Sequence, residues 1–249
     1  TPTRCQVDLD ALHHNLDVGR RLAGGRKVLA AVKADAYGHG LVAVARAIEE
    51  RGDADWLGIA VTDEGTQLRR AGIRLPILKF SPTLPDDLAE ALAADVTVSV
   101  GDLAAVRSLQ EAAAAAGRTV DVHLKIDTGM RRVGAEPGEA GALAAAVLAS
   151  PNLRATGAFT HLPVSDVPDG AAFTRAQLDA FEDAIGGAPD FIDGHQHVHQ
   201  LPGFFRIAVF QGHANLVRCV ALRLDELAQQ FDIKIAFVEH TGHGFFPVQ

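Results

Sequence analysis

Cysteine is scarce in this sequence: Cys5 and Cys219 are the only two among 249 residues, and they do not form a CxxC pair. A disulfide framework or a zinc ribbon needs several cysteines at short, regular intervals, so the cysteine content excludes both. Two inert thiols are typical of a protein that is kept in a reducing compartment. We therefore expect a cytoplasmic protein.

Long apolar runs and an excess of positive charge are also missing. Stretches such as ALAAAVLAS (142–150) are far shorter than the roughly 20 residues that span a membrane, so no membrane partner is expected. Lys and Arg number 23 against 31 for Asp and Glu, which gives a net charge of −8. Nucleic-acid binding favours a basic face. The charge balance argues against that partner and leaves a small-molecule substrate or cofactor.

The sequence does contain a regular alternation of two patterns. Ala- and Leu-rich helical stretches separate short apolar runs, which lie at 28–33, 56–61, 76–80, 96–100, 120–127 and 155–161. Strands that are apolar throughout are typical of a parallel sheet covered on both faces. Six such βα units predict an α/β fold, a (β/α)8 TIM-like barrel. Because no Pro-, Ser- or Gly-rich linker interrupts residues 1–249, we expect a single barrel.

The pattern changes after Phe181. Six of the eleven histidines fall within residues 195–243. Residues 190–197 are expected to form the seventh strand. The segments 216–222 and 233–240 are alternatives for the eighth strand, with a helix between them. Which of the two closes the barrel is left open by the sequence.

The stretch AVKADAYGHG (31–40) carries the most specific chemistry. Alternation along the first strand brings Lys33 to its carboxyl end, which is where barrel enzymes place their active sites. A lysine there can form a Schiff base with a carbonyl cofactor if burial or a nearby cation keeps its amine neutral. Tyr37 could donate to a phosphate group. A strand-end lysine can also be purely structural or face solvent.

The segments VDLDALHHNL and AVKADAYGHG, followed by HLKIDTGMRRVG (123–134) and GAFTHL (157–162), resemble the N-terminal barrel of alanine racemase. The resemblance covers about residues 5–185 and keeps the order of the motifs in that family. It implies an isomerase of fold type III that uses pyridoxal 5'-phosphate (PLP). In this reading Lys33 carries PLP as the internal aldimine and acts as one of two acid/base groups, and Tyr37 contacts the PLP phosphate.

The same resemblance assigns roles to three later residues. His161 packs against the pyridine ring, and Arg132 lies beside the phenolic oxygen of the cofactor. Lys125 matches a lysine that is often carbamylated in this family and that orients the arginine. A carbamate is an anion that accepts a bidentate bond from an arginine. The alternatives are an ion pair of Lys125 with Asp121 or Asp127, and a hydrogen-bonded core histidine at position 161.

The resemblance fails at two points. Racemisation needs acid/base groups on both faces of the Cα carbanion. In the family the second group is a tyrosine from the C-terminal β-domain of the partner subunit, whereas Tyr37 is the single tyrosine here. We therefore expect impaired racemisation, no such β-domain, and a monomer or a weak homodimer. The phosphate-binding motifs that should follow are also broken, and in GHANLVRCVAL (212–222) Arg218 alone could meet the pyridine nitrogen.

The segment IDGHQHVHQLPG (192–203) suggests a different chemistry, a divalent metal site. On a strand, Asp193, His195, His197 and His199 share one face, about 6.6 Å apart per step. Two neighbours in that row can reach one ion. The alternative is a row of polar strand-end residues that hydrogen-bond to one another.

This segment is similar to a signature of the YdjC-like carbohydrate deacetylases, which are metal-dependent barrels. His240 and His243 could complete such a site. We therefore interpret residues 1–187 as racemase-like and residues 188–249 as deacetylase-like, joined within 186–190 into one barrel, as in an engineered chimera. Three functions remain open: a PLP-binding racemase-like barrel, an inactive chimeric scaffold, and a metal-dependent deacetylase-like hydrolase.

Overall fold

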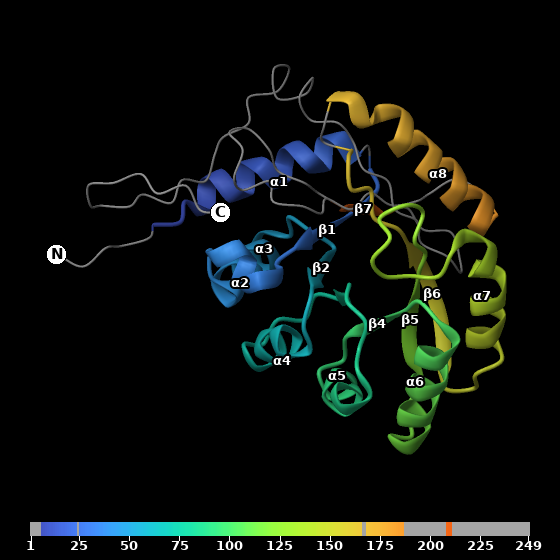
Figure 1. Cartoon of the computed structure of the whole chain (residues 1–249). Helices are drawn as coiled ribbons and strands as arrows, with labels where there is room; N and C mark the ends of the chain where they lie inside the picture. The colour runs from blue at the N-terminus through green and yellow to red at the C-terminus, as the bar shows by residue number, and fades with distance from the viewer. Residues whose placement is uncertain (1–5, 24, 166–167, 187–207, 211–249) are drawn as a thin grey trace.

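The computed structural model describes residues 6–23, 25–165, 168–186 and 208–210. Within these ranges, six strands alternate with helices along the chain (Figure 1). The strands are β1 (Lys27–Ala31), β2 (Trp56–Ile59), β3 (Ile77–Lys79), β4 (Thr97–Val100), β5 (Val120–Lys125) and β6 (Leu153–Phe159). Each falls within or next to a run that the sequence predicted as a strand.

The helices also follow the predicted pattern. They are α1 (Leu9–Ala23), α3 (Leu41–Arg51), α4 (Thr62–Arg70), α5 (Leu88–Ala93), α6 (Leu103–Ala115), α7 (Ala140–Leu148) and α8 (Ala171–Ile185), with short 3-10 turns at Pro85–Asp87, Pro137–Glu139 and Pro168–Gly170. Asp102 shows how such a helix begins, because its side chain accepts the backbone N–H of Ala105 at the start of α6. The sequence did not predict α8 or the short element α2 (Lys33–Gly38).

The sheet is parallel from β1 to β6, with each strand paired to the next along the chain. The helices lie around the outer side of this curved sheet (Figure 1). At its other edge, β1 pairs in antiparallel orientation with β7 (Ala208–Phe210). That pairing differs from the parallel closing strand that the sequence suggested. The candidates at 190–197, 216–222 and 233–240 lie outside the described residues, so a closed eight-stranded barrel remains a prediction.

Alternate residues of the strands build two separate cores. Leu57 and Ile59 of β2 belong to the large outer core between the sheet and the helices. Leu29, Leu78 and Phe159 form a small inner core on the concave side, and Trp56 and Phe80 pack against it. Because side chains point to opposite faces with period two, the inner face also receives His123 and Lys125 of β5, whose neighbours Val122 and Leu124 are in the outer core.

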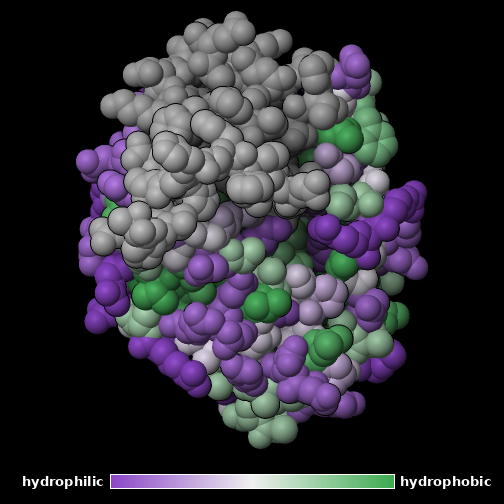
Figure 2. All heavy atoms as spheres, turned by 60° about the vertical axis from the view of Figure 1, so that its left-hand side comes forward, coloured by the Kyte–Doolittle hydropathy of each residue, from purple (hydrophilic) through white to green (hydrophobic). Residues whose placement is uncertain are grey.

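The visible surface of the described residues has no continuous apolar face. In Figure 2 the hydrophobic residues form separate patches among hydrophilic ones. Among the described helices, none has the length and apolar character needed to cross a membrane.

Candidate active site at the carboxyl ends of the strands

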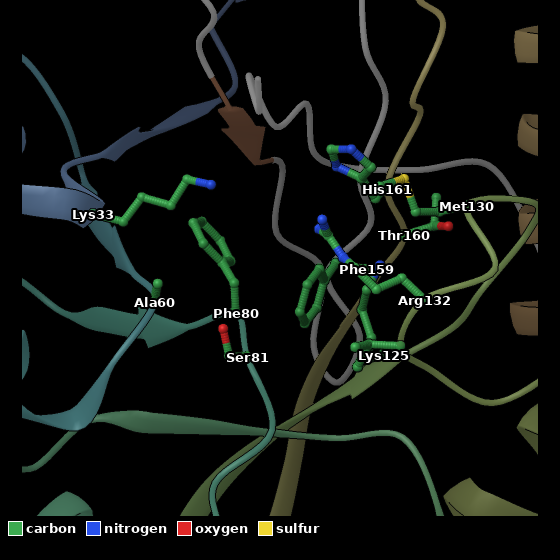
Figure 3. Close-up of a pocket in the computed structure, with 11 residues that line it drawn as sticks. Lys33, Ala60, Phe80, Ser81, Lys125, Met130, Arg132, Phe159, Thr160 and His161 are labelled. Carbon is green, nitrogen blue, oxygen red and sulfur yellow. The ribbon is translucent and has the colours of Figure 1, made fainter. Parts of the chain in front are cut away.

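A cavity of about 300 Å³ lies where β1, β2, β3, β5 and β6 end. Its walls come from residues at or just after these strand ends (Figure 3). The lining consists of Lys33, Ala60, Phe80, Ser81, Lys125, Met130, Arg132, Val133, Phe159, Thr160 and His161. Four of the residues that the sequence singled out, Lys33, Lys125, Arg132 and His161, therefore meet around one space.

Lys33 reaches the cavity from an unusual turn. The next four residues, Ala34 to Tyr37, all have φ between 51° and 56°, so α2 is a left-handed turn rather than a right-handed helix. Left-handed backbone costs non-glycine residues roughly 1–2 kcal/mol each. Such a turn persists only where the surrounding structure holds it, so the position of Lys33 depends on contacts outside the turn.

Several hydrogen bonds hold this turn. The N–H of Ala36 donates to the carbonyl of Val32 (2.8 Å), and the N–H of Gly40 donates to the carbonyl of Asp35 (2.9 Å). The Asp35 carboxylate accepts the N–H of Leu41 (2.7 Å), which connects the turn to the start of α3. The N–H of Ala34 donates across to the carboxylate of Glu64 in the next βα unit.

Tyr37 lies at the end of the left-handed turn, next to the lysine. Its ring centroid is 5.7 Å from the Lys33 Nζ, a cation–π distance. The phenol is thus placed beside the amine, although it is not one of the residues in the cavity lining as described. Its predicted contact with a phosphate group stays a prediction.

The loop after β5 brings Met130 and Arg132 to the opposite wall. Asp127, which is 5% exposed, accepts the N–H groups of Gly129 (2.9 Å), Arg131 (3.0 Å) and Arg132 (2.9 Å). Burial raises the pKa of Asp127, but these hydrogen bonds and the charge of Lys125 outweigh that effect and leave the pKa below its ordinary value. A carboxylate that stays ionised is a stable acceptor, so the loop has a fixed path.

Lys125 ends β5 and is 7% exposed, with its Nζ 4.8 Å from the centroid of the Phe159 ring. Asp121 pairs with Arg154 at 2.6 Å. Asp127 instead accepts backbone donors, and the charge of Lys125 acts on its pKa. The structure thus places Lys125 in the cavity wall, together with Arg132.

His161 follows β6 and is 8% exposed. Its backbone carbonyl accepts the side-chain N–H of Gln177 from α8 at 3.1 Å. The same amide is 3.4 Å from the Thr128 hydroxyl, which is 2.8 Å from the hydroxyl of Thr160. Gln177 therefore joins the loops after β5 and β6, and fixes the backbone that carries the histidine on the far side of the cavity from Lys33 (Figure 3).

One layer below Lys125, His123 is buried against Trp56, with the ring centroids 5.6 Å apart. Burial lowers the pKa of His123 to about 4 and outweighs the opposing effect of the charge of Asp121. The imidazole is therefore neutral near pH 7. Its Nε2 has no hydrogen-bond partner among the residues that the structure describes.

Sequence reasoning missed the residues that hold the site in place: Glu64, Asp127 and Gln177. For Glu64 a partial signal existed, because an acidic residue at the third helical position can accept the N–H of the residue before the helix, as Glu64 does from Val61 at 3.1 Å. Valine has no side-chain acceptor, so the reciprocal half of a capping box is missing. Asp127 was considered only as an ion-pair partner for Lys125. No pattern in the sequence connects Gln177 with Thr128, because the contact spans 49 positions.

The predicted metal site lies outside the described residues, as does Arg218. Asp193, His195, His197 and His199 fall in 187–207, and His240 and His243 in 211–249. In the described part of the chain, no group of three or more His, Cys, Asp or Glu side chains could hold a metal ion.

A parallel α/β sheet with a lysine, other cations and a histidine around a cavity at its carboxyl ends defines the class: a TIM-like α/β domain with its candidate site in the loops that follow the strands. The sequence model described as "Alanine racemase, N-terminal domain" matches residues 7–219. The chain belongs to this family. The match continues past 186–190, so it gives no support to a change of family at that point.

Individual relatives agree with this assignment. An alanine racemase of Cutibacterium acnes is 45% identical over 185 residues, which cover 74% of this chain and 49% of that protein. One of Desulfovibrio desulfuricans is 35% identical over 220 residues, covering 87% of this chain and 58% of that protein. The chain thus spans about half the length of the curated relatives it matches.

Solved structures show the same fold. The alanine racemase from D-cycloserine-producing Streptomyces lavendulae aligns with a TM-score of 0.69 at 36% identity, over 88% of this chain and 58% of that one. A histidine racemase from Leuconostoc mesenteroides aligns with a TM-score of 0.68 at 26% identity, over 75% of this chain and 50% of that one.

Proposed function

We propose that this chain forms the PLP-binding barrel of an amino-acid racemase that acts on alanine. The observation that carries the proposal is the convergence of Lys33, Lys125, Arg132 and His161 on one cavity at the carboxyl ends of the sheet. The named racemase relatives support the same reaction class. The substrate is inferred from those relatives, since a racemase for histidine is built on the same fold.

The chemistry of the cavity fits a phosphorylated aldehyde. Its volume of about 300 Å³ is that of a small-ligand site. The lining described above contains two lysines, an arginine and a histidine and no carboxylate. Even with Lys125 converted to a carbamate anion, Lys33 and Arg132 remain as cations that favour an anionic ligand. Phe80 and Phe159, whose ring centroids are 6.0 Å apart, give it an apolar wall suited to an aromatic ring.

Each residue then has a defined task. When bound, PLP supplies the electron sink that stabilises negative charge on the amino-acid Cα. Lys33 holds the cofactor through its amine and moves the proton at Cα on its own face. Arg132 would hold the side of the cofactor that carries the phenolic oxygen, and a carbamate on Lys125 would orient this arginine. His161 would pack on the ring.

Two assignments concern the phosphate and the ring nitrogen. Tyr37 would bind the phosphate from its place beside Lys33. Arg218 would hold the pyridine nitrogen, as the sequence resemblance implies. Neither role is tested by the contacts in the described residues.

The proton on the opposite face needs a second group. Tyr37 is the single tyrosine of the 249 residues, and it stands next to Lys33. Reduced racemisation therefore remains our prediction for these 249 residues taken alone, together with a monomeric or weakly dimeric state. The complete reaction is proposed for a protein in which a second acid/base group faces Lys33 across the cavity.

The division into 1–187 and 188–249 stays a proposal without support from the comparisons, as do the chimeric scaffold and the deacetylase-like hydrolase. The histidine motif that motivates them lies outside the described residues. We keep one barrel over 1–249 as the proposed organisation. No second function is favoured by a contact in the described residues.

The test is a titration of the purified protein with PLP, followed by borohydride reduction and mass-spectrometric mapping of the modified lysine. We expect a visible absorbance band and an adduct on Lys33, both lost in Lys33→Ala. Lys27→Ala is the matched control, because Lys27 begins β1, the strand that Lys33 follows, and is exposed. An absorbance spectrum that Lys33→Ala leaves unchanged would sink the proposal. Metal analysis of the same sample, with His195→Ala/His197→Ala, tests the hydrolase alternative.

A further inference from the structure

Glu64, on α4, touches two loops of the site at once. One carboxylate oxygen accepts the N–H of Ala34 at 2.5 Å, and the other accepts the N–H groups of Ala60 (2.8 Å) and Val61 (3.1 Å). The residue is 7% exposed. Buried hydrogen bonds to a charged acceptor are among the strongest in proteins, so this carboxylate is a rigid link between the loops after β1 and β2.

The N–H of Ala34, which donates from the loop after β1, lies at the start of the left-handed turn. Ala34 directly follows Lys33 and is the first of the four left-handed residues. The other hydrogen bonds described for this turn, from Ala36, Gly40 and Leu41, stay within residues 32–41. The N–H of Val32, just before Lys33, donates to the Gly58 carbonyl of β2 (2.8 Å), and the bond from Ala34 to Glu64 ties the backbone on the other side of Lys33 to the same βα unit.

The loop after β2, which contains Ala60, forms part of the same cavity wall. Ala60 lines it, as does Lys33, and Figure 3 shows the two residues on the same side of the site. The same carboxylate bonds to the N–H of Ala60 and to the N–H of Ala34, next to Lys33. It therefore fixes the position of the Lys33 backbone relative to the cavity wall at Ala60. Loss of one carboxylate oxygen would release one of the two loops from the other.

We propose that Glu64 is a positioning residue for Lys33, which fixes the left-handed turn so that the lysine amine points into the cavity. The inference rests on the proposed function, since it concerns the reactivity of Lys33 toward an aldehyde. Glu64 is not among the cavity-lining residues named above. Its effect on Lys33 is therefore exerted through the backbone of Ala34.

The test compares Glu64→Gln with Glu49→Gln. Glu49 is a matched control because its carboxylate also accepts two backbone N–H groups, from Arg74 (2.6 Å) and Leu75 (2.8 Å), before β3. The rate of PLP adduct formation is measured at a temperature where all proteins are folded, and the modified lysine is mapped. Since small misplacements of a reacting group cost large factors in rate, we expect Glu64→Gln to slow modification of Lys33 at least about tenfold. Glu49→Gln should keep the wild-type rate.

A merely structural role would lower the thermal midpoint of both variants and leave the rate at Lys33 unchanged, which would overturn the proposal. Equal slowing in Glu49→Gln would do the same. If Glu64→Gln does not fold, Glu64→Asp serves, because its carboxylate is one methylene shorter and cannot bridge both loops; a wild-type rate there contradicts the proposal.

One measurement needs no variant. The amide of Ala34 should be protected from hydrogen exchange in the wild type, and rapid exchange would overturn the proposal. A wild-type protein that forms no adduct at all refutes the proposed function instead, while protection of Ala34 can still be observed.

Discussion

The loops after β1 and β5 deliver cations to opposite walls of the same cavity, and they are held in different ways. In the first, Lys33 precedes a left-handed turn of non-glycine residues tied to Glu64, 30 positions away. In the second, Asp127 at the start of the loop accepts three N–H groups from residues two to five positions later. The first loop depends on tertiary structure, whereas the second organises itself locally.

Adding one methyl group to each loop is expected to show the largest difference between them. Gly134, in the loop after β5, has φ +123°, and a Cβ there would lie 2.8 Å from the N of Asp127 and 2.9 Å from the carbonyl O of Lys125. Gly38, at the end of the turn after β1, has φ +82° with nothing within 4 Å. Backbone cannot move aside as a side chain can, so Gly134→Ala should cost more than about 3 kcal/mol of unfolding free energy.

Gly38→Ala should cost only about 1 kcal/mol, the price of left-handed backbone without a clash. Urea denaturation of both variants checks the difference. Equal losses would show that the two loops are not packed as differently as their surroundings indicate.

The strands beneath the loops differ in their response to acid. β1 carries Leu29 on its inner face, while β5 carries His123, whose pKa burial lowers to about 4. An unfolded histidine titrates near 6.5, so between pH 6.5 and 4 the unfolded chain binds more protons and stability falls as the pH falls. The loss should approach about 3 kcal/mol.

His123→Leu should remove this part of the pH dependence. Unfolding free energies at pH 7 and pH 4.5, for the wild type and the variant, measure it. An identical pH dependence in both proteins would mean that His123 is not held neutral by burial.

A smaller effect is expected from the carboxylate that organises the second loop. Asp127→Asn keeps one acceptor oxygen but replaces the other with an NH₂ group, so one N–H loses its charged acceptor and the cost should be about 2 kcal/mol. Because the folded pKa of Asp127 is lowered, its contribution is complete above the unfolded value near 3.9 and disappears as the pH falls through the folded value.

Denaturation at pH 7 and pH 3 tests both parts of this prediction. The two proteins should differ at pH 7 and converge in acid. A difference that persists unchanged at pH 3 would show that Asp127 does not act through its ionised carboxylate.

Much of the fold could be predicted because the positions of strands and helices follow from patterns of neighbouring residues. The apolar runs at 56–61 and 120–127 became β2 and β5, and the glycine at position 52 ends α3 in left-handed conformation. The left-handed turn at Ala34–Tyr37 could not be predicted, because alanine, aspartate and tyrosine favour right-handed backbone. The contact with Glu64 decides that conformation, and no spacing rule connects two residues 30 positions apart.

The sequence alone predicted which residues carry the proposed chemistry: Lys33 from its place after the first strand, and Lys125, Arg132 and His161 from motifs that resemble those of alanine racemase. It did so because strand periodicity and motif order are local properties of the chain. Asp127 organises its own loop through bonds to residues two to five positions later. The tertiary structure decided that the four site residues share one cavity and that Glu64 and Gln177 connect separate loops around it. Parallel strands bring their carboxyl ends to one edge only when the sheet is assembled, so those contacts exist only in the folded protein.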